Sequence, residues 1–533
     1  MFRTAELGRT VSREDFHAAV PALRAGLLDA QRLLRAARFP VIIVFGGVDK
    51  GGKIETINLL NEWLDPRWMV TRAYGPPSDE MAERPEYWRY WRDLPPKGRM
   101  GIFLRCWYSR PILDQVNDRT TEAEFDEALD RIIAFERELA DDGALILKFW
   151  MHLGKKAQKQ RLTKLEANPL TRWRVSQMDW DHWHLYDKFI ATAERVIRRT
   201  SIGHASWQIV EGEDKRYRSL AVAKSILDAV RAHLEKMELQ RRMIGEMRAI
   251  TETSLADDMV PVGEPEAADA KVIPLPRITV LSRLDVSRTI DSKLYEKRKE
   301  EFQGKINLVV RRAKELGVSS LLVFEGWDAA GKGGAIRRLV AALDARDYEV
   351  IPIAAPTEEE RAQHYLWRFW RHLSRAGRMT IFDRSWYGRV LVERVEGFAQ
   401  EAEWKRAFAE INDFEDQLVR HGIVLCKFWF HISKDEQLAR FKAREGTPYK
   451  RWKLTDEDWR NREKWDQYEQ AVDDMIEHTS SRLAPWTLVE ANDKRYARVK
   501  VLKTIYERLD GGVAAAQGAK SQAPKKVKME KAG

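Results

Sequence analysis

Cysteine is nearly absent from this chain of 533 residues, which contains only Cys106 and Cys426. Two cysteines predict neither a disulfide framework nor a cysteine-based metal site, and they suit a reducing cytoplasm. No apolar run reaches the length of about 18 residues that a membrane helix needs, and the first ten residues, MFRTAELGRT, contain no apolar signal core. We therefore expect a soluble cytoplasmic protein with no membrane partner.

Two catalytic arrangements are also missing. The sequence shows no Ser-His-Asp constellation and no His/Cys set with the spacing of metal ligands. His364, His372 and His431 are scattered, and we interpret each of them as structural. Nucleophilic hydrolysis and zinc chemistry therefore have no support in the sequence.

Charge is in modest basic excess, with 92 Lys and Arg against 82 Asp and Glu, a formal +10. Five Lys and one Glu lie after Asp510, so +4 of that excess belongs to a tail that we expect to be disordered. The remainder is explained either by solubility or by attraction to a polyanion. Many of the 20 Trp neighbour Arg, but Trp367, Trp370 and Arg371 have the i, i+3, i+4 spacing of helix core contacts. No nucleic-acid module is present, and we expect no specific nucleic-acid partner.

A phosphate-binding pattern occurs twice. The second copy reads LLVFEGWDAAGKGGAIRRL (321–339) and the first reads IIVFGGVDKGGKIETINLL (42–60). Each has an apolar β-rich run, then Gly-x-x-x-x-Gly-Lys, then a helical pattern. In such a loop glycines let backbone N–H groups face an anion, the lysine reaches its oxygens, and the helix N-terminus adds a favourable dipole.

The two copies stand 279 positions apart (332 − 53), and the same offset aligns most of each half without a gap. The repeat is much too long for a solenoid and indicates a duplicated domain. An acidic, Pro-rich stretch at 253–277 has the composition of a linker. We predict a first domain at 1–240, a helix end and linker at 241–283, a second domain at 284–510 and a disordered basic tail at 511–533.

Strand and helix patterns alternate through the second half. The expected strands are 321–325, 379–383, 424–432 and 487–490, and the expected helices are 333–343, 401–421, 435–444 and 497–509, with a Trp- and Arg-rich helical stretch at 448–480. This alternation predicts an α/β fold, with a mostly parallel sheet covered on both faces. The phosphate loop then lies at the carboxyl end of the first strand, where such sheets bind ligands.

The second loop departs from the common pattern after its lysine. Lys332 is followed by Gly333 where a Ser or Thr normally ligates magnesium, and Asp328 inside the loop is the obvious substitute. The alternative is that Asp328 only shapes the turn. The expected phosphate-binding residues of the loop are Gly326, Gly331, Lys332, Gly333 and Gly334.

The second set of candidates follows the apolar strand at 379–383. Asp383 closes this strand, where a second metal carboxylate is expected, and Arg384 and Arg389 follow in the sequence DRSWYGR. Arginines grip phosphates in a bidentate manner, although each of these two could instead form a structural salt bridge.

The third set is the basic helical stretch, which we interpret as a lid that closes over phosphates. A solvated charged helix is the alternative for any one member. The cations expected to face phosphate are Lys450, Arg451, Lys453, Arg460 and Arg462. The same set of basic residues includes Arg440, Lys442 and Arg444 of the helix before this stretch.

Together, GxDxxGKGG after a strand, WRxW, FDRSWYGR and a Trp-rich basic lid resemble the polyphosphate kinase 2 family over roughly residues 15–235 and 284–510. The resemblance implies a P-loop kinase-like three-layer sandwich with a helical lid, duplicated in tandem. It implies magnesium-dependent transfer of the terminal phosphoryl group of inorganic polyphosphate, in the tandem form to AMP, giving ADP. By this resemblance Asp328 and Asp383 hold Mg²⁺, Lys332 binds phosphate, and Arg384 and Arg389 contact the phosphates in transit.

The first half differs at the chemical positions. Leu104 stands where the second half has Asp383, and Ile54 and Glu55 replace Gly333 and Gly334. In the lid, Thr171, Asp181 and Trp183 replace Lys450, Arg460 and Arg462. We therefore assign catalysis to the second half. The first half serves either as a packing partner, in a chain expected to form a dimer of tandem domains, or as a polyphosphate-binding domain.

Alternatives remain open for the substrates. The loop alone also permits an ATP-dependent nucleotide kinase or a nucleic-acid-binding NTPase. Within polyphosphate-dependent transfer, ADP or another nucleotide is the alternative acceptor. An AMP acceptor is a phosphate monoester that is already anionic, so the site needs charge neutralisation and alignment more than a general base.

Overall fold

The computed structural model describes residues 1–257, 279–447 and 454–522. Within them the chain forms two compact units, the first containing most residues up to 274 and the second most of those from 275. We refer to them as the first unit and the second unit. The predicted domain boundaries themselves remain a prediction. No helix in the described ranges is long and apolar enough to cross a membrane, and Cys106 and Cys426 are both buried free thiols.

The second unit is built on a five-stranded sheet in the order β10-β9-β6-β8-β7, and every neighbouring pair is parallel. Its central strand β6 carries the phosphate loop and lies between β8 and β9. This is the switch point of the sheet, where connections leave in opposite directions and open a crevice at the carboxyl edge. The strands are β6 (Ser320–Gly326), β7 (Tyr348–Pro352), β8 (Met379–Asp383), β9 (Val424–His431) and β10 (Trp486–Glu490).

The first unit repeats this sheet in the order β2-β3-β1-β4-β5, also fully parallel. Each strand starts 279 positions before its counterpart, as in 320 − 41 for the central pair. The predicted duplication is therefore correct at the level of single residues. The strands are β1 (Val41–Gly47), β2 (Met69–Ala73), β3 (Met100–Leu104), β4 (Leu145–His152) and β5 (Trp207–Glu211).

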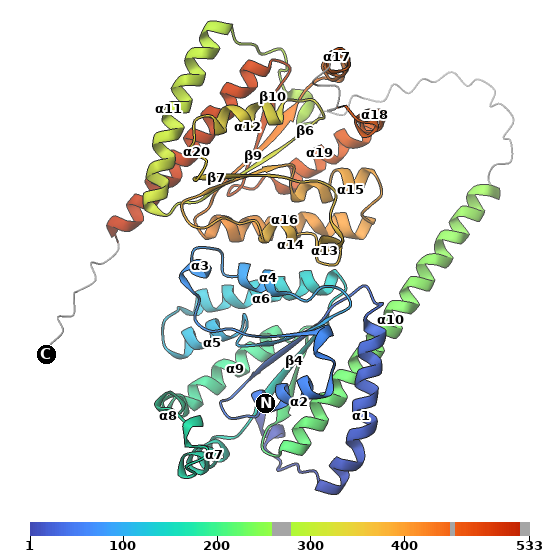
Figure 1. Ribbon diagram of the computed structural model, residues 1–533, viewed down its shortest axis with the longest axis vertical. Coiled ribbons are helices and arrows are strands. Elements are labelled where there is room, and N and C mark those ends of the chain that lie inside the picture. Colours follow the sequence, from blue (N-terminus) through green and yellow to red (C-terminus); the bar gives the residue numbers. More distant parts are fainter. Residues whose placement is uncertain (258–278, 448–453, 523–533) are drawn as a thin grey trace. The chain divides into compact units, whose positions relative to one another are not determined.

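Helices cover both faces of each sheet, which gives the predicted three-layer α/β architecture (Figure 1). The first 257 residues contain α1 (Arg13–Leu34), α2 (Lys53–Trp63), α3 (Asp79–Ala82), α4 (Trp88–Asp93), α5 (Ser109–Val116), α6 (Glu122–Asp141), α7 (Lys155–Ala167), α8 (Gln177–His184), α9 (Tyr186–Thr200) and α10 (Lys215–Asp257), with short 3₁₀ turns η1 (Phe2–Ala5), η2 (Pro66–Trp68) and η3 (Arg172–Arg174). After residue 278 follow η4 (Leu281–Arg283), α11 (Ser292–Leu316), α12 (Lys332–Val340), α13 (Glu358–Arg361), α14 (Trp367–Trp370), η5 (Trp386–Arg389), α15 (Val392–Val395), α16 (Glu401–Arg420), α17 (Lys434–Glu445), α18 (Asp456–Glu463), α19 (Trp465–Thr479) and α20 (Lys494–Gln522).

Parts of the fold differ from expectation, among them the helix α11, which was not one of the expected helices. The edge strand β7, with the sequence YEVIP, was not predicted because it has only one buried residue, Ile351, and no apolar run. The segment 511–522, expected to be disordered, continues helix α20. Its Ala-rich sequence favours a helix, and Val513 is completely buried. Residues 523–533 lie outside the described ranges.

A fully buried polar cluster lies between β9, α16 and the segment that follows β8. Lys427 Nζ donates to Glu415 Oε2 (2.7 Å), Tyr387 Oη (2.8 Å) and the Thr479 carbonyl (2.8 Å). Trp386 Nε1 and Tyr387 Oη both donate to Glu415 Oε1, at 3.1 and 2.6 Å. We call these five residues the Lys–Glu cluster. It ties the Trp-Tyr pair of DRSWYGR to the core of the second unit.

The first unit contains the same cluster with almost the same distances. Lys148 donates to Glu136 (2.7 Å), Tyr108 (2.8 Å) and the Thr200 carbonyl (2.8 Å), and Trp107 donates to Glu136 at 3.0 Å. The cluster is therefore present also in the first unit, which has Leu104 at the position equivalent to Asp383. It belongs to the scaffold of the fold rather than to its chemistry.

Replacing Lys427 with Met should lower the free energy of unfolding by about 3 to 5 kcal/mol, because Glu415 is then left buried without its cation. Denaturant unfolding measures this loss. The Lys148→Met variant is the matched control and should destabilise the first unit to a similar extent. A loss below about 1 kcal/mol in both variants would show that the cluster does not hold the core.

Candidate active site

The loop between β6 and α12 depends on its two end glycines. Gly326 has φ +146°, and a Cβ there would lie 2.5 Å from the Phe430 carbonyl oxygen. Gly331 is the N-cap of α12 with φ +114°, a left-handed conformation that side chains disfavour. The loop can therefore adopt this backbone path only with glycine at these two positions.

Lys332 lies at the start of α12 and folds back over the loop. Its Nζ donates to the carbonyls of Gly326 (2.6 Å) and Trp327 (3.2 Å). Burial lowers the pKa of this amine, whereas the nearby Asp328 carboxylate opposes that shift. An added anion would favour the charged form in the same way. The predicted phosphate-binding role of Lys332 fits this geometry.

The start of α12 is sterically open. A Cβ on Gly333 would meet no atom within 4 Å, and one on Gly334 would meet only the Arg498 guanidinium, at 3.4 Å. These two glycines therefore leave the positive end of the helix dipole accessible to an anion.

Asp328 lies inside the loop and is held from two sides. Its Oδ1 is 3.3 Å from Arg384 Nη2, and its Oδ2 accepts a hydrogen bond from Asn461 Nδ2 at 2.9 Å. The structure thus connects the phosphate loop, the end of β8 and the helix α18 through one carboxylate. Asn461 was not predicted, because nothing in the basic lid sequence separates it from its neighbours.

Asp383 and Arg384 end β8 beside the phosphate loop. Asp383 pairs in register with Phe324 of β6, and its carboxylate is half-buried, with no hydrogen-bond or ion-pair partner among the described residues. Arg384 adopts φ +67°, and its N–H donates to the Phe324 carbonyl at 3.1 Å. This left-handed turn brings the Arg384 guanidinium to Asp328. Asp328, Lys332, Asp383 and Arg384 are therefore brought together as the sequence suggested.

Arg389, on the turn η5, already has structural contacts. Its guanidinium pairs with Glu393 at 3.2 Å and lies 4.5 Å from the centre of the Tyr365 ring. Its buried Nε has no hydrogen-bond partner within the described ranges. Contact between Arg389 and a phosphate remains a prediction.

The lid cations have mixed positions. Lys450, Arg451 and Lys453 lie outside the described residues. Arg460 is 3.3 Å from Glu396, and Arg462 donates to the Lys434 carbonyl (2.6 Å) and to Gln437 (3.2 Å). Arg460 and Arg462 thus already have partners within the protein. Binding of phosphate by any of these five cations stays a prediction.

Arg440 has a clear structural role. It is buried on α17 and donates to the carbonyls of Ala329 and Ala330 in the loop and to those of Ala491 and Asn492 after β10. Its side chain therefore supports the phosphate loop from behind. Arg161 makes matching contacts in the first unit, to Lys50, Gly212 and Glu213.

Sequence reasoning also missed Glu325, the last residue of β6 before Gly326. It is buried, with 6% of its surface exposed, and accepts a hydrogen bond from Ser385 Oγ at 2.8 Å. Burial raises its pKa. A charged residue at the end of an otherwise apolar run was the signal that could have revealed it.

The corresponding loop of the first unit is closed by its own side chains. Asp49 accepts a hydrogen bond from His182 Nδ1 at 2.7 Å, and Lys50 pairs with Asp179 at 2.9 Å and donates to the Arg174 carbonyl at 2.6 Å. We call these contacts the loop latch. They connect the loop to α8 and to the turn before it, which occupy the position of the lid.

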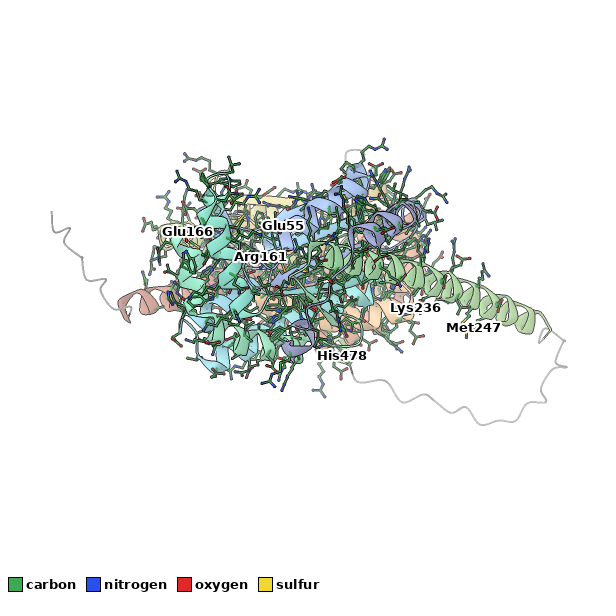
Figure 2. The ribbon with its side chains drawn as sticks, turned by 90° about the horizontal axis from the view of Figure 1, so that it is seen from below. Glu55, Arg161, Glu166, Lys236, Met247 and His478 are labelled. Atoms are coloured by element: carbon green, nitrogen blue, oxygen red, sulfur yellow. The ribbon has the colours of Figure 1, made fainter. Side chains whose placement is uncertain are left out.

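Other groups fill the same end of the first unit. Arg218 is buried, and a Cβ on Gly52 would lie 2.3 Å from its Nε. Glu55 occupies the first turn of α2, and Figure 2 shows it near Arg161 at this end of the unit. Helix start and loop are therefore less open here than in the second unit.

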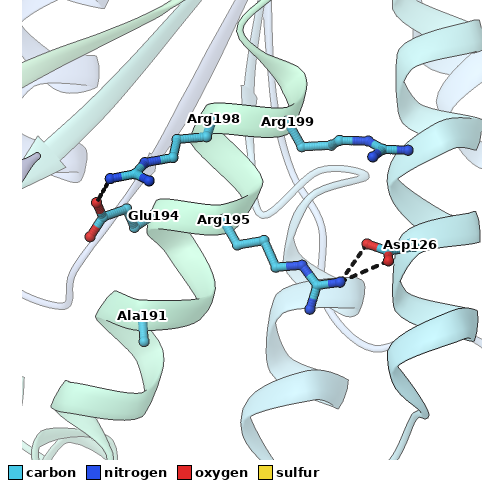
Figure 3. A pocket seen from close by; sticks show the side chains of 6 residues that line it. All are labelled: Asp126, Ala191, Glu194, Arg195, Arg198 and Arg199. Carbon is cyan, nitrogen blue, oxygen red and sulfur yellow. Dashed lines mark hydrogen bonds and ion pairs between the residues drawn. The ribbon is translucent and has the colours of Figure 1, made fainter.

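A shallow pocket elsewhere in the first unit, between α6 and α9, carries three arginines (Figure 3). Each is matched by an acid: Arg195 pairs with Asp126, Arg198 with Glu194, and Arg199 with Asp130. This surface is a network of ion pairs and not an unneutralised anion site.

The parallel sheet, the glycine loop at its central strand and the carboxylate on the adjacent strand define the chain as a P-loop phosphotransferase. Two stretches, residues 10–238 and 289–516, match the family model described as Polyphosphate kinase 2 (PPK2). The chain therefore belongs to the polyphosphate kinase 2 family, in a tandem form with two copies.

Relatives of nearly full length agree with this assignment. A polyphosphate:AMP phosphotransferase of Pseudomonas aeruginosa (strain PAO1) is 50% identical over 511 residues, covering 96% of this chain and 99% of the relative. A protein of the same name from Acinetobacter johnsonii is 37% identical over 502 residues, covering 91% and 95%. A crystal structure from Pseudomonas aeruginosa PA01 that bears the name polyphosphate kinase 2 superposes with a TM-score of 0.83 at 47% identity, covering 96% and 99%.

The loop latch should be sensitive to pH. The hydrogen bond to Asp49 raises the pKa of His182. The stability that protonated His182 adds to the fold is therefore complete below about pH 6.5 and is lost as the pH rises through the raised pKa. Burial raises the pKa of the Asp49 carboxyl, but His182 and Lys53 outweigh it and lower this pKa to about 2. The stability that ionised Asp49 adds to the fold is therefore lost as the pH falls from about 4. NMR titration should find the His182 pKa above 6.5, with the signal assigned by comparison with His182→Gln, and Asp49→Asn should lower it. A wild-type value at or below about 6.5 would contradict the latch.

Proposed function

We propose that the second unit transfers the terminal phosphoryl group of inorganic polyphosphate to AMP, giving ADP. The observation that carries this proposal is the convergence of Asp328, Lys332, Asp383 and Arg384 at the carboxyl edge of β6 and β8. The names of the two full-length relatives supply the donor and the acceptor.

The residues at this edge fit a magnesium ion. Asp328 and Asp383 offer only oxygen donors, as Mg²⁺ prefers, and the Asp383 carboxylate has no hydrogen-bond or ion-pair partner in the described part of the chain. We propose that these two carboxylates hold it. When bound, Mg²⁺ would offset the charge on the polyphosphate oxygens. Because Gly333 stands where related loops use Ser or Thr, we assign to Asp328 the role of the substitute oxygen ligand.

The chain's own cations do the rest. Lys332 is positioned to reach phosphate oxygens over the loop, and Arg384 can exchange its contact with Asp328 for one with the phosphoryl group in transfer. Donor and acceptor are both polyanions, so alignment and neutralisation of charge are the main requirements. AMP brings an anionic nucleophile, and no proton needs to be removed from it. Asn461 of helix α18 donates to Asp328, which connects this helix to the loop.

The first unit lacks this chemistry. Leu104 leaves the end of β3 without a carboxylate, and Asp49 and Lys50 are engaged in the loop latch. We propose that it acts as a structural partner. We further propose that the chain works in the cytoplasm, where its two thiols stay reduced, and that two chains associate into a dimer of tandem domains. Light scattering on the purified protein measures the latter directly.

Product analysis tests the donor and the acceptor together. Purified protein with Mg²⁺ and AMP should form ADP from long-chain polyphosphate and not from ATP. ADP formed only from ATP would identify a nucleotide kinase and refute the proposal. ATP formed from ADP and polyphosphate, without any reaction of AMP, would retain the donor and change the acceptor.

Matched variants test which unit is catalytic. Lys332→Ala and Asp383→Asn should each lower kcat by about 10²-fold or more. The first change removes a cation that neutralises phosphate oxygens, and the second removes a carboxylate that we propose holds Mg²⁺. Lys53→Ala, the equivalent change in the first unit, should retain at least about a third of the activity, since Leu104 already removes the partner carboxylate there. Steady-state ADP formation from polyphosphate and AMP measures all three. Equal losses in Lys53→Ala and Lys332→Ala would contradict the assignment.

A further inference from the structure

Glu325 is a buried acid that the proposed mechanism does not use. It lies on β6 directly before Gly326, and its Oε1 accepts the hydrogen bond of Ser385 Oγ. Ser385 is itself buried, with 3% of its surface exposed, and follows Asp383 and Arg384 in the chain. Burying a carboxylate costs stability, so its presence requires an explanation.

The first unit provides an internal comparison. At the same offset of 279, Gly46 stands for Glu325 and Cys106 for Ser385. The space around Gly46 is filled, since a Cβ there would lie 3.1 Å from the rings of Trp150 and Trp207. Both members of the pair are thus replaced in the unit whose strand ends in Leu104.

The turn nevertheless begins with a left-handed arginine in both units, although α5 follows it in the first unit and η5 in the second. Arg105 has φ +53° and Arg384 has φ +67°. Trp107 and Tyr108 are held by Glu136 just as Trp386 and Tyr387 are held by Glu415. The fold therefore forms this turn without a Glu–Ser pair, and the pair accompanies the catalytic carboxylate.

In the second unit the pair adds a side-chain connection to the turn. The Arg384 backbone N–H donates to the Phe324 carbonyl. The next residue, Ser385, donates through its Oγ to Glu325, the residue that follows Phe324. The same hydroxyl accepts the Tyr387 N–H at 3.3 Å. Strand β6, which carries the loop, is thereby fixed to the residues that carry Asp383 and Arg384.

We propose that Glu325, through the Ser385 hydroxyl, is a positioning residue that fixes the Asp383–Arg384 turn relative to the phosphate loop. The inference rests on the proposed function, because it is the alignment of these groups with the phosphoryl group that the pair improves. A displacement of about 1 Å in such a site can cost up to about 10²-fold in rate. Glu325 itself touches neither substrate in this account.

The test uses the full-length chain with Ser385→Ala, Ser385→Thr, Glu325→Gln/Ser385→Ala and the first-unit control Cys106→Ala. Ser385→Ala should lower kcat about tenfold while the KM for AMP changes less than about twofold, because alignment and not binding is lost. Ser385→Thr keeps the hydroxyl and should recover most of the activity. The double variant should be no slower than Ser385→Ala, since both changes remove one interaction. Cys106→Ala should match the wild type.

Hydrogen exchange of the peptide that spans residues 383–389 provides a readout independent of activity. Exchange should be about tenfold faster in Ser385→Ala than in the wild type, should be restored by Thr, and should not change in Cys106→Ala. Unchanged exchange in Ser385→Ala would overturn the inference whatever kcat does, and so would an unchanged kcat in an active enzyme. If the wild type makes no ADP from polyphosphate, the proposed function fails, and the exchange rates still decide whether this pair fixes the turn.

Discussion

The buried ion pair between Lys427 and Glu415 is the constraint on which the active site depends. Glu415 also accepts hydrogen bonds from Trp386 and Tyr387, three and four residues after Asp383. A charge pair this deep is costly to bury and is tolerated because each of its oxygens is satisfied. The carboxylate and the arginine at the end of β8 are therefore positioned by the core and not by the surface loop in which they lie.

Duplication separates the requirements of the fold from those of the reaction. The Lys–Glu cluster, the left-handed turn after the strand and the arginine behind the loop occur in both units. Asp383 and the Glu325–Ser385 pair occur only in the second. The residues that both units share explain why the chain folds twice in the same way, and the residues found only in the second unit are those to which we assign the chemistry.

Much of this architecture could be predicted from the sequence, because it depends on local patterns. The strands of the second unit that end in Gly326, Asp383 and His431 are apolar runs bounded by glycine or charge, and glycine spacing identifies the loop. The edge strand β7 was missed because it has little to bury. The contacts of Asn461, Arg462 and Glu325 could not be predicted, since each joins residues far apart in the chain and depends on side-chain direction. The helix that continues to Gln522 was missed because the Gly-, Ala- and Lys-rich composition of the tail indicated disorder, and the burial of Val513 could not be seen in the sequence.

Replacement of Arg462 by Trp183 in the first unit has an evolutionary consequence. Arg462 donates to the carbonyl of Lys434, and Trp183 Nε1 donates to the carbonyl of the equivalent Lys155 at 3.1 Å. The same polar group is satisfied by a residue without charge, so the first unit lost a cation while keeping its helix in place. With Lys50 and His182 also committed to new partners, a carboxylate restored at position 104 would enter surroundings that no longer suit it. Substitutions of this kind would each reduce the advantage of reversing another, so the division of labour that we propose between the two units would be hard to undo.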